Sequence, residues 1–127
     1  MKIWKLKFAS YKEKDDMFNM ILDGKKTVET RSRNPNDGEN DYSNIKVDDI
    51  LEITSLDSGN KIEKVVTFNH IYNSIEELVQ HEDVTKILPS VSSNDEYLKV
   101  IEEIKNKWGD KYKFELENYG VVATGFK

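Results

Sequence analysis

The sequence predicts a single α+β domain in which a mixed β-sheet curls into a small barrel and helices flank it. Strand-like alternation of apolar and charged residues occurs near both ends of the chain. Segments with helical apolar spacing, several of them opened by capping boxes, lie between the two ends. The length of 127 residues is sufficient for one hydrophobic core and too short for two domains. This order of elements suits a barrel whose terminal strands pair with each other.

The first strand and the first helix are expected before residue 24. In the segment Lys2 to Phe8, large apolar side chains alternate with lysines, which predicts a half-buried strand. The segment Ser10-Tyr11-Lys12-Glu13 matches a capping box and predicts a helix that continues to Asp23. Gly24 stands where a helix C-cap favours a residue without Cβ.

A hairpin is expected in the middle of the chain. Its strands are Ile50 to Leu56 and Lys61 to Tyr72, and Asp57-Ser58-Gly59-Asn60 supplies the turn chemistry. His70 shares one face of the second strand with large apolar residues, which favours a hydrogen-bonded barrel histidine over a catalytic base.

Three further helical segments are predicted from capping signals and stop signals. Ser74-Ile75-Glu76-Glu77 opens a short helix to about His81, and Ile87-Leu88-Pro89 ends a second short turn. Ser93-Asn94-Asp95-Glu96 opens the longest helix, which Gly109 ends. On its apolar stripe, Tyr97 and Trp108 are expected as core anchors rather than as platforms for stacked bases.

The C-terminal part combines an alternating segment with a strand. Tyr112, Phe114 and Leu116 alternate with charged residues, and Tyr119 to Phe126 reads as a strand. Gly120 and Gly125 permit bending or a close approach of another chain segment.

Residues 32–43 are predicted to form a long flexible loop. The segment is rich in Asn, Asp, Gly and Ser, so it cannot repay the entropy of ordering by burying apolar surface. Such loops are uncommon in compact domains unless they act as lids or are insertions. Both readings, a lid over a bound ligand and an inert insertion, remain open.

Composition excludes several classes of function. The net charge of −5 argues against a wide phosphate-binding surface, so any nucleic-acid contact is expected to be local. Without cysteine, and with two histidines outside any spacing motif, neither a metal site nor a cofactor is expected. No apolar run approaches the ~20 residues of a membrane span and no signal peptide is apparent, so we expect a cytoplasmic protein with no membrane partner.

The candidate site is the charged segment that follows Gly24. Alternation along this strand places five residues on one face: Lys25, Thr27, Glu29, Arg31 and Arg33. Lys26 lies so close to the turn that its direction cannot be fixed. So much charge on one face must border solvent or a wet cleft.

The segment Gly-Lys-Lys-Thr-Val-Glu-Thr-Arg, residues 24–31, resembles the signature G-x-K-x-x-E-x-R of ASCH domains, members of the PUA-like superfamily. The resemblance extends over nearly the whole chain and is strongest to small stand-alone prokaryotic ASCH proteins. It includes the opening strand, the turn 45–49 before the next strand, Ile87-Leu88-Pro89 and the closing segment 118–122. Where the family usually has Gly-Asp, this chain has Asp48-Asp49.

The resemblance implies a PUA-like β-barrel and a cleft that binds RNA or a nucleoside- or nucleotide-like ligand. The residue types suit such a ligand, because arginine offers a planar donor fork for phosphate or base edges and a glutamate accepts from an amine or hydroxyl. The expected ligand-binding residues are Lys25, Lys26, Thr27, Glu29, Arg31 and Arg33.

Two enzymatic alternatives stay open, with Lys26 and Glu29 as candidate catalytic residues. One branch resembling this family hydrolyses N4-acetylcytidine with a lysine, a threonine nucleophile and a glutamate. By motif position its lysine falls on Lys26 but its threonine falls on Glu29, so Thr27 would have to substitute. The other alternative is metal-independent RNA cleavage with Lys26 as acid and Glu29 as base.

A third hypothesis gives the charged strand no ligand at all. In it, Glu29 and Arg31 form a structural ion pair within an interaction domain. The sequence leaves the oligomeric state open.

Overall fold

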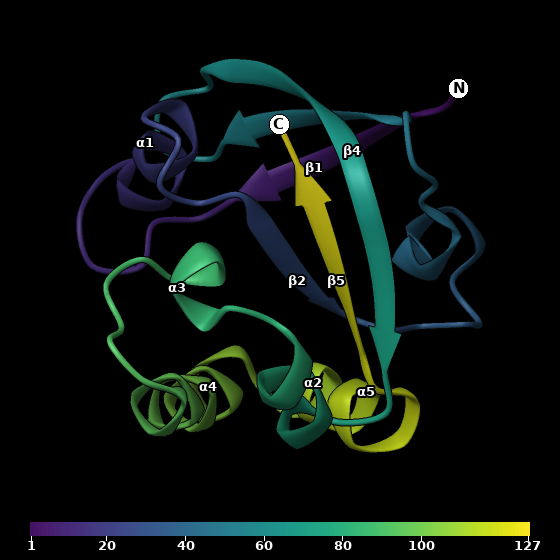
Figure 1. Cartoon of the computed structure of the whole chain (residues 1–127), viewed down its shortest axis with the longest axis vertical. Helices are drawn as coiled ribbons and strands as arrows, with labels where there is room; N and C mark the ends of the chain where they lie inside the picture. Colours follow the sequence, from purple (N-terminus) through teal and green to yellow (C-terminus); the bar gives the residue numbers. More distant parts are fainter.

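Five strands form one mixed sheet in the computed structural model, which describes residues 1–127, and the sheet curls into a half-barrel flanked by helices (Figure 1). The strand order is β1-β3-β4-β5-β2, in which β1 and β3 are parallel and all other neighbours are antiparallel. The strands are β1 (Ile3–Phe8), β2 (Val28–Ser32), β3 (Ile50–Ser55), β4 (Lys61–Tyr72) and β5 (Val121–Phe126). The helices are α1 (Asp16–Leu22), α2 (Ile75–His81), α3 (Val84–Ile87), α4 (Asn94–Trp108) and α5 (Asp110–Tyr119), with the 3₁₀ turns η1 (Gly38–Asn40) and η2 (Tyr42–Asn44).

The long strand β4 produces the curl. Its first half pairs with β3, its second half pairs with β5, and a register shift between Val66 and Phe68 separates the two halves. Gly125 lies opposite Phe68, where a Cβ would stand 2.0 Å from the aromatic ring, so only glycine allows this approach.

The prediction that the two terminal strands pair with each other is wrong. β1 pairs with β3, and β5 lies between β4 and β2, so β1 and β2 remain as the two edges of the sheet. The long, bent β4 connects the two halves of the sheet, so closure through the chain ends is not needed.

Two hydrophobic clusters lie on the two sides of this arrangement. One fills the hollow of the half-barrel and includes Trp4, Leu6, Phe18, Leu51 and Phe126. The other joins the second half of the sheet to α2–α5, and α2, α4 and α5 gather at one end of the strands in Figure 1. Strand β5 is buried along its whole length because it contributes to both clusters.

The caps at Ser74 and Ser93 are confirmed, whereas the cap at Ser10 is wrong. Ser74 and Ser93 each accept a hydrogen bond from the amide three residues on. Helix α1 begins only at Asp16, whose carboxylate accepts from the backbone amides of residues 11, 12 and 13. This carboxylate takes the amides of Lys12 and Glu13, from which a cap at Ser10 would accept, and residues 11–15 form bends and turns.

The alternation at residues 112–116 belongs to helix α5 and not to a strand. Tyr112 and Leu116, four residues apart, face the core, while Phe114 between them is exposed. Gly109, with φ of 86°, separates α4 from α5. The apolar residues alternate with a period of two in the sequence because the exposed Phe114 stands between the inward-facing Tyr112 and Leu116.

The segment 32–43 contains more local structure than its composition indicated. It ends in η1 and the start of η2, and Asp41 is buried, with its carboxylate accepting from Ser43. The Tyr42 ring lies 6.1 Å from that of Trp4. The following turn places Asp48 at φ 73°, the backbone conformation for which a glycine is usual. None of the helices is both long and apolar enough to cross a lipid bilayer.

Candidate functional site

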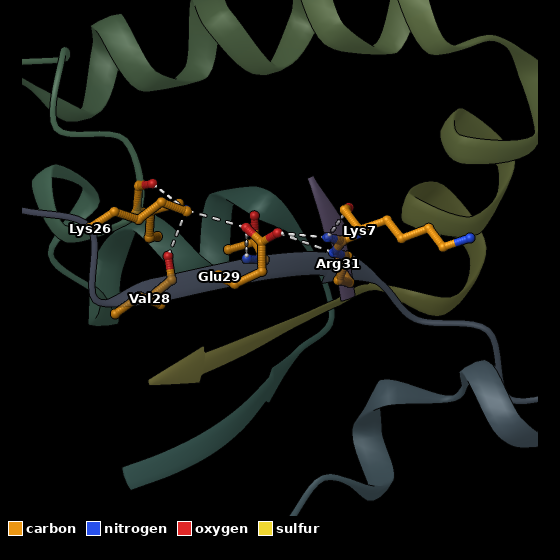
Figure 2. A network of polar contacts seen from close by, with 7 residues as sticks. Lys7, Lys26, Val28, Glu29 and Arg31 are labelled. Carbon is orange, nitrogen blue, oxygen red and sulfur yellow. Dashed lines mark hydrogen bonds and ion pairs between the residues drawn. The ribbon is translucent and has the colours of Figure 1, made fainter. Parts of the chain in front are cut away.

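A cleft of about 520 Å³ opens between strand β2 and helices α4 and α5. Its walls carry both aromatic and charged side chains, and its lining includes Lys26, Glu29 and Arg31 of the charged segment. Figure 2 shows these three residues along β2, with the Glu29 carboxylate between the two cations and directed toward the side where the helices lie. A volume of this order accommodates a small organic ligand.

The turn at Gly24 brings Lys26 into the interior. Gly24 adopts φ 80°, and the amide of Lys26 donates to the carbonyl of Met20, so the chain folds back on the end of α1. The Lys26 side chain is 1% exposed. Its ammonium donates to the carbonyls of Val28 (2.8 Å) and Ile87 (2.5 Å) and pairs with Glu29 Oε1 at 3.2 Å. These three partners use all three N–H donors of the lysine.

Glu29 lies between two cations, and both of its oxygens are paired. Oε1 accepts from Lys26 Nζ and from the backbone amide of Thr30, and Oε2 accepts from Nε of Arg31 at 3.1 Å. Nη2 of Arg31 forms an ion pair with the same oxygen at 3.0 Å. Burial alone would raise the pKa of Glu29, but Lys26 and Arg31 outweigh it, so the pKa lies below its ordinary value.

Burial lowers the pKa of Lys26, and the charge of Glu29 opposes that change. Three oxygen acceptors around the nitrogen, one of them a carboxylate, are the environment of a charged ammonium. We therefore assign Lys26 and Glu29 as a buried ion pair.

Arg31 is the cation of this network that reaches the cleft. Its Nη2 also donates to the carbonyl of Lys7 at 3.0 Å, so the side chain links the two edge strands β2 and β1. The guanidinium lies over the rings of Phe8 and Tyr42, at 5.1 and 5.9 Å. The side chain is 30% exposed, and Nη1 has no hydrogen-bond partner in the protein. Its two N–H groups are free to bind a ligand.

The other three predicted site residues lie outside the lining of the cleft. Lys25 is exposed and stands 3.9 Å from Asp23. The backbone of Thr27 is bonded to Lys86 and Phe126, and the backbone amide of Arg33 is bonded to Gly120. A threonine does line the cleft, but it is Thr30 and not Thr27.

Sequence reasoning missed the contribution of α4 and α5. Tyr97, Trp108 and Tyr112 line the cleft, and Trp108 is 58% exposed rather than a core anchor. Trp108 is not part of the cluster that joins the sheet to α2–α5, and its ring packs against that of Tyr112, with ring centroids 5.3 Å apart. The spacing that places Trp108 on the apolar stripe of α4 could not show where the core ends.

The cleft is locally positive although the chain is acidic. Five cationic side chains line it, from Lys7, Lys26, Arg31, Lys107 and Lys111, against three carboxylates from Glu29, Asp37 and Glu115. Against the net charge of −5 for the whole chain, this is a concentrated positive region. Such a cleft attracts anions without making the whole surface basic.

A second cluster of polar side chains lies on β4 and α2. The Glu82 carboxylate accepts from the Tyr72 hydroxyl and is paired with His70 Nδ1 at 2.9 Å, while the His70 ring stacks on Phe68. His70 is therefore hydrogen-bonded, as expected, but half-exposed rather than inside the barrel. No group of three or more His, Asp or Glu side chains is placed to hold a metal ion.

No model of a known protein family and no curated protein matches the sequence. Two solved structures are similar over nearly the whole chain. The crystal structure of hypothetical protein PH0355 matches with a TM-score of 0.69 and 24% identity, over 98% of this chain and 97% of that one. The solution NMR structure of protein PF0455 from Pyrococcus furiosus matches with a TM-score of 0.62 and 22% identity, over 98% and 96%. At these identities the likeness concerns the fold alone, and it supports the mixed α+β half-barrel.

Proposed function

We propose that the cleft between β2, α4 and α5 binds a nucleotide, either free or as part of a single-stranded RNA. The observation that carries the proposal is Arg31, which lines an aromatic-lined cleft, is held by Glu29 and has no hydrogen-bond partner in the protein for its Nη1 group. Arginine held in this way binds phosphate or a base edge with both charge and planar geometry.

The aromatic side chains that line the cleft favour a ligand that contains a ring system. Trp108 and Tyr112 form one wall, and an exposed indole beside lysines suits stacking of a nucleobase with its phosphate nearby. The lining of the cleft has more cationic than acidic side chains, whereas the whole chain carries a net charge of −5. This distribution favours a short contact with one or a few nucleotides over an extended nucleic-acid interface.

We also propose that the fold is PUA-like and that the chain is an ASCH-type protein. This proposal is based on the motif at residues 24–31 and on its position at the cleft. In this proposal Arg31 contacts the ligand, while Lys26 and Glu29 are positioning residues that hold it. The occupied hydrogen-bonding groups of Lys26 and Glu29 favour binding over hydrolysis or RNA cleavage, since neither is free to exchange a proton with a substrate.

Tryptophan fluorescence offers a direct test. Trp4 is buried and hydrogen-bonded to Asp49, so a change in emission on adding a cleft ligand reports on Trp108. We expect saturable quenching by short single-stranded RNA or by ribonucleoside monophosphates, weakened by added salt. Trp108→Leu serves as the control that removes the signal. Unchanged emission of the wild-type protein with all of these ligands, together with no binding by calorimetry, would refute the proposal.

A further inference from the structure

Around Glu29, the hydrogen-bond acceptors of the cleft are already paired within the protein, whereas some hydrogen-bond donors have no partner. Lys26 donates to three oxygens, and both oxygens of Glu29 are already paired with neighbouring donors. What remains is the Nη1 group of Arg31, which can only donate. A ligand amine or hydroxyl that sought the Glu29 carboxylate would have to displace an existing partner.

A second free donor is Tyr97, on the first turn of α4. The side chain is 1% exposed and lines the cleft, and its hydroxyl has no hydrogen-bond partner in the protein. Burial raises the pKa of the phenol far above its ordinary value, and the nearby Glu29 charge acts in the same direction. The hydroxyl therefore stays protonated and keeps a proton to donate.

An unpaired buried hydroxyl is costly to keep. Leaving such a group unsatisfied costs about 1–3 kcal/mol, and buried polar groups without a partner are few in folded proteins. The Thr30 side chain is a neighbour of the Tyr97 hydroxyl but makes no hydrogen bond of good geometry with it. A phenylalanine would fill the same space without that cost.

We infer that Tyr97 is a ligand-contacting residue that determines specificity, and that its hydroxyl donates to an acceptor atom of the bound molecule. With Arg31 Nη1 as the other donor, the ligand edge that these two donors contact carries acceptors: a base carbonyl, a ring nitrogen or phosphate oxygens. Exocyclic amino groups face the aromatic walls or the solvent instead. This inference rests on the proposed function and specifies which edge of the ligand is read.

The test is Tyr97→Phe, which removes one oxygen and keeps the ring. The probes are the ribonucleoside monophosphates, short single-stranded RNA and inorganic phosphate, with dissociation constants measured by calorimetry. We expect binding of at least one probe to weaken about tenfold, the effect of losing one good hydrogen bond in a buried site. Weakening with phosphate alone as well as with nucleotides identifies a phosphate oxygen as the acceptor, and weakening with nucleotides only identifies the base or the sugar.

The matched control is Tyr72→Phe, because the Tyr72 hydroxyl is already bonded to Glu82, outside the cleft. Thermal unfolding of both variants adds a readout that is independent of any ligand. We expect Tyr97→Phe to melt at or above the wild-type temperature and Tyr72→Phe to melt below it. A lower melting temperature for Tyr97→Phe would show that the hydroxyl has a structural partner, and would overturn the inference.

The failure of this inference differs from the failure of the proposed function. If the wild-type protein binds a probe and Tyr97→Phe binds it equally well, Tyr97 does not read the ligand while the cleft remains a binding site. If the wild-type protein binds none of the probes, the proposed function and the inference both fail.

Discussion

Two carboxylates of the protein, Glu29 and Glu82, are nearly buried among paired polar neighbours, and they differ in what surrounds them. Glu29 lies between Lys26 and Arg31 beside a cleft of about 520 Å³. Glu82 lies between Tyr72 and His70 beside a hollow of about 540 Å³, which is more open to solvent and lined by fewer residues. Arg31 lines the cleft and its Nη1 group has no hydrogen-bond partner in the protein, whereas the Tyr72 hydroxyl and His70 Nδ1 are both used within the cluster.

The difference shows that a buried charge alone does not define a binding site. Both clusters satisfy the rule that buried ionic groups are paired. Only the first combines pairing with a more enclosed cleft, an excess of cationic over acidic side chains in its lining and an arginine Nη1 group that has no partner in the protein. We therefore propose ligand binding for the Glu29 cluster and a structural role for the Glu82 cluster.

The largest expected effect comes from removing the buried cation. Lys26→Met leaves Glu29 and the carbonyls of Val28 and Ile87 without the ammonium, so we expect the free energy of unfolding to fall by about 3–5 kcal/mol. Urea denaturation of the wild type and the variant measures this change in the free energy of unfolding. Lys25→Met is the matched control, because Lys25 is exposed and its pair with Asp23 is long, and a change within about 0.5 kcal/mol is expected. Similar losses in both variants would contradict the assignment.

Substitution of Arg31 is expected to reduce ligand binding most strongly. Arg31→Lys keeps the charge and the contact with Glu29 but loses the planar fork and the free Nη1 group. We expect affinity for the best-binding RNA or nucleotide to fall about tenfold or more, with a smaller change in stability. Calorimetric titration of both proteins decides the point, and equal affinities would assign the ion pair to the scaffold alone.

Acid titration is expected to weaken the Glu29 cluster. Because the pKa of Glu29 is lower in the folded protein than in the unfolded chain, its contribution to stability is present above the unfolded value of about 4.3 and is lost as the pH falls through the folded pKa. The stability difference between wild type and Glu29→Gln should thus be largest near neutral pH and shrink below about pH 4. Urea midpoints measured at several pH values test this, and a pH-independent difference would contradict it.

The smallest effect is expected at His70. The imidazole is half-exposed, so its pairing with Glu82 is screened by solvent. We expect His70→Ala to change the free energy of unfolding by about 1 kcal/mol or less and to leave RNA and nucleotide binding unchanged. A loss of ligand affinity in His70→Ala would remove the distinction between the two clusters.

Local signals predicted much of the fold, and they failed where tertiary contacts decide. The strands around the 57–60 turn and the caps at Ser74 and Ser93 depend on neighbouring residues, so the sequence reveals them. The start of α1 depends on Asp16, which competes with Ser10 for the same amides. The pairing of β1 with β3 depends on contacts between residues far apart in the chain.

The candidate site was predictable in part for the same reason. Alternation along β2 placed Glu29 and Arg31 together, whereas the burial of Lys26 follows from a carbonyl of Ile87, sixty-one residues away. The cleft walls come from α4 and α5, and nothing in the sequence of α4 distinguishes the exposed Trp108 from the buried Tyr97. The pairing of both Glu29 oxygens likewise emerges only from the positions of the neighbouring residues.

The central claim is that a nucleotide or a short RNA binds in the cleft and not at the Glu82 cluster, and a two-dimensional NMR titration tests it most directly. With ribonucleoside monophosphates or single-stranded RNA, we predict shifts of the backbone amides of Glu29 to Arg31 and of the Trp108 indole N–H. The amides of His70, Tyr72 and Glu82 should stay in place. Shifts confined to those three residues, or no shifts with any of these ligands, would contradict the account.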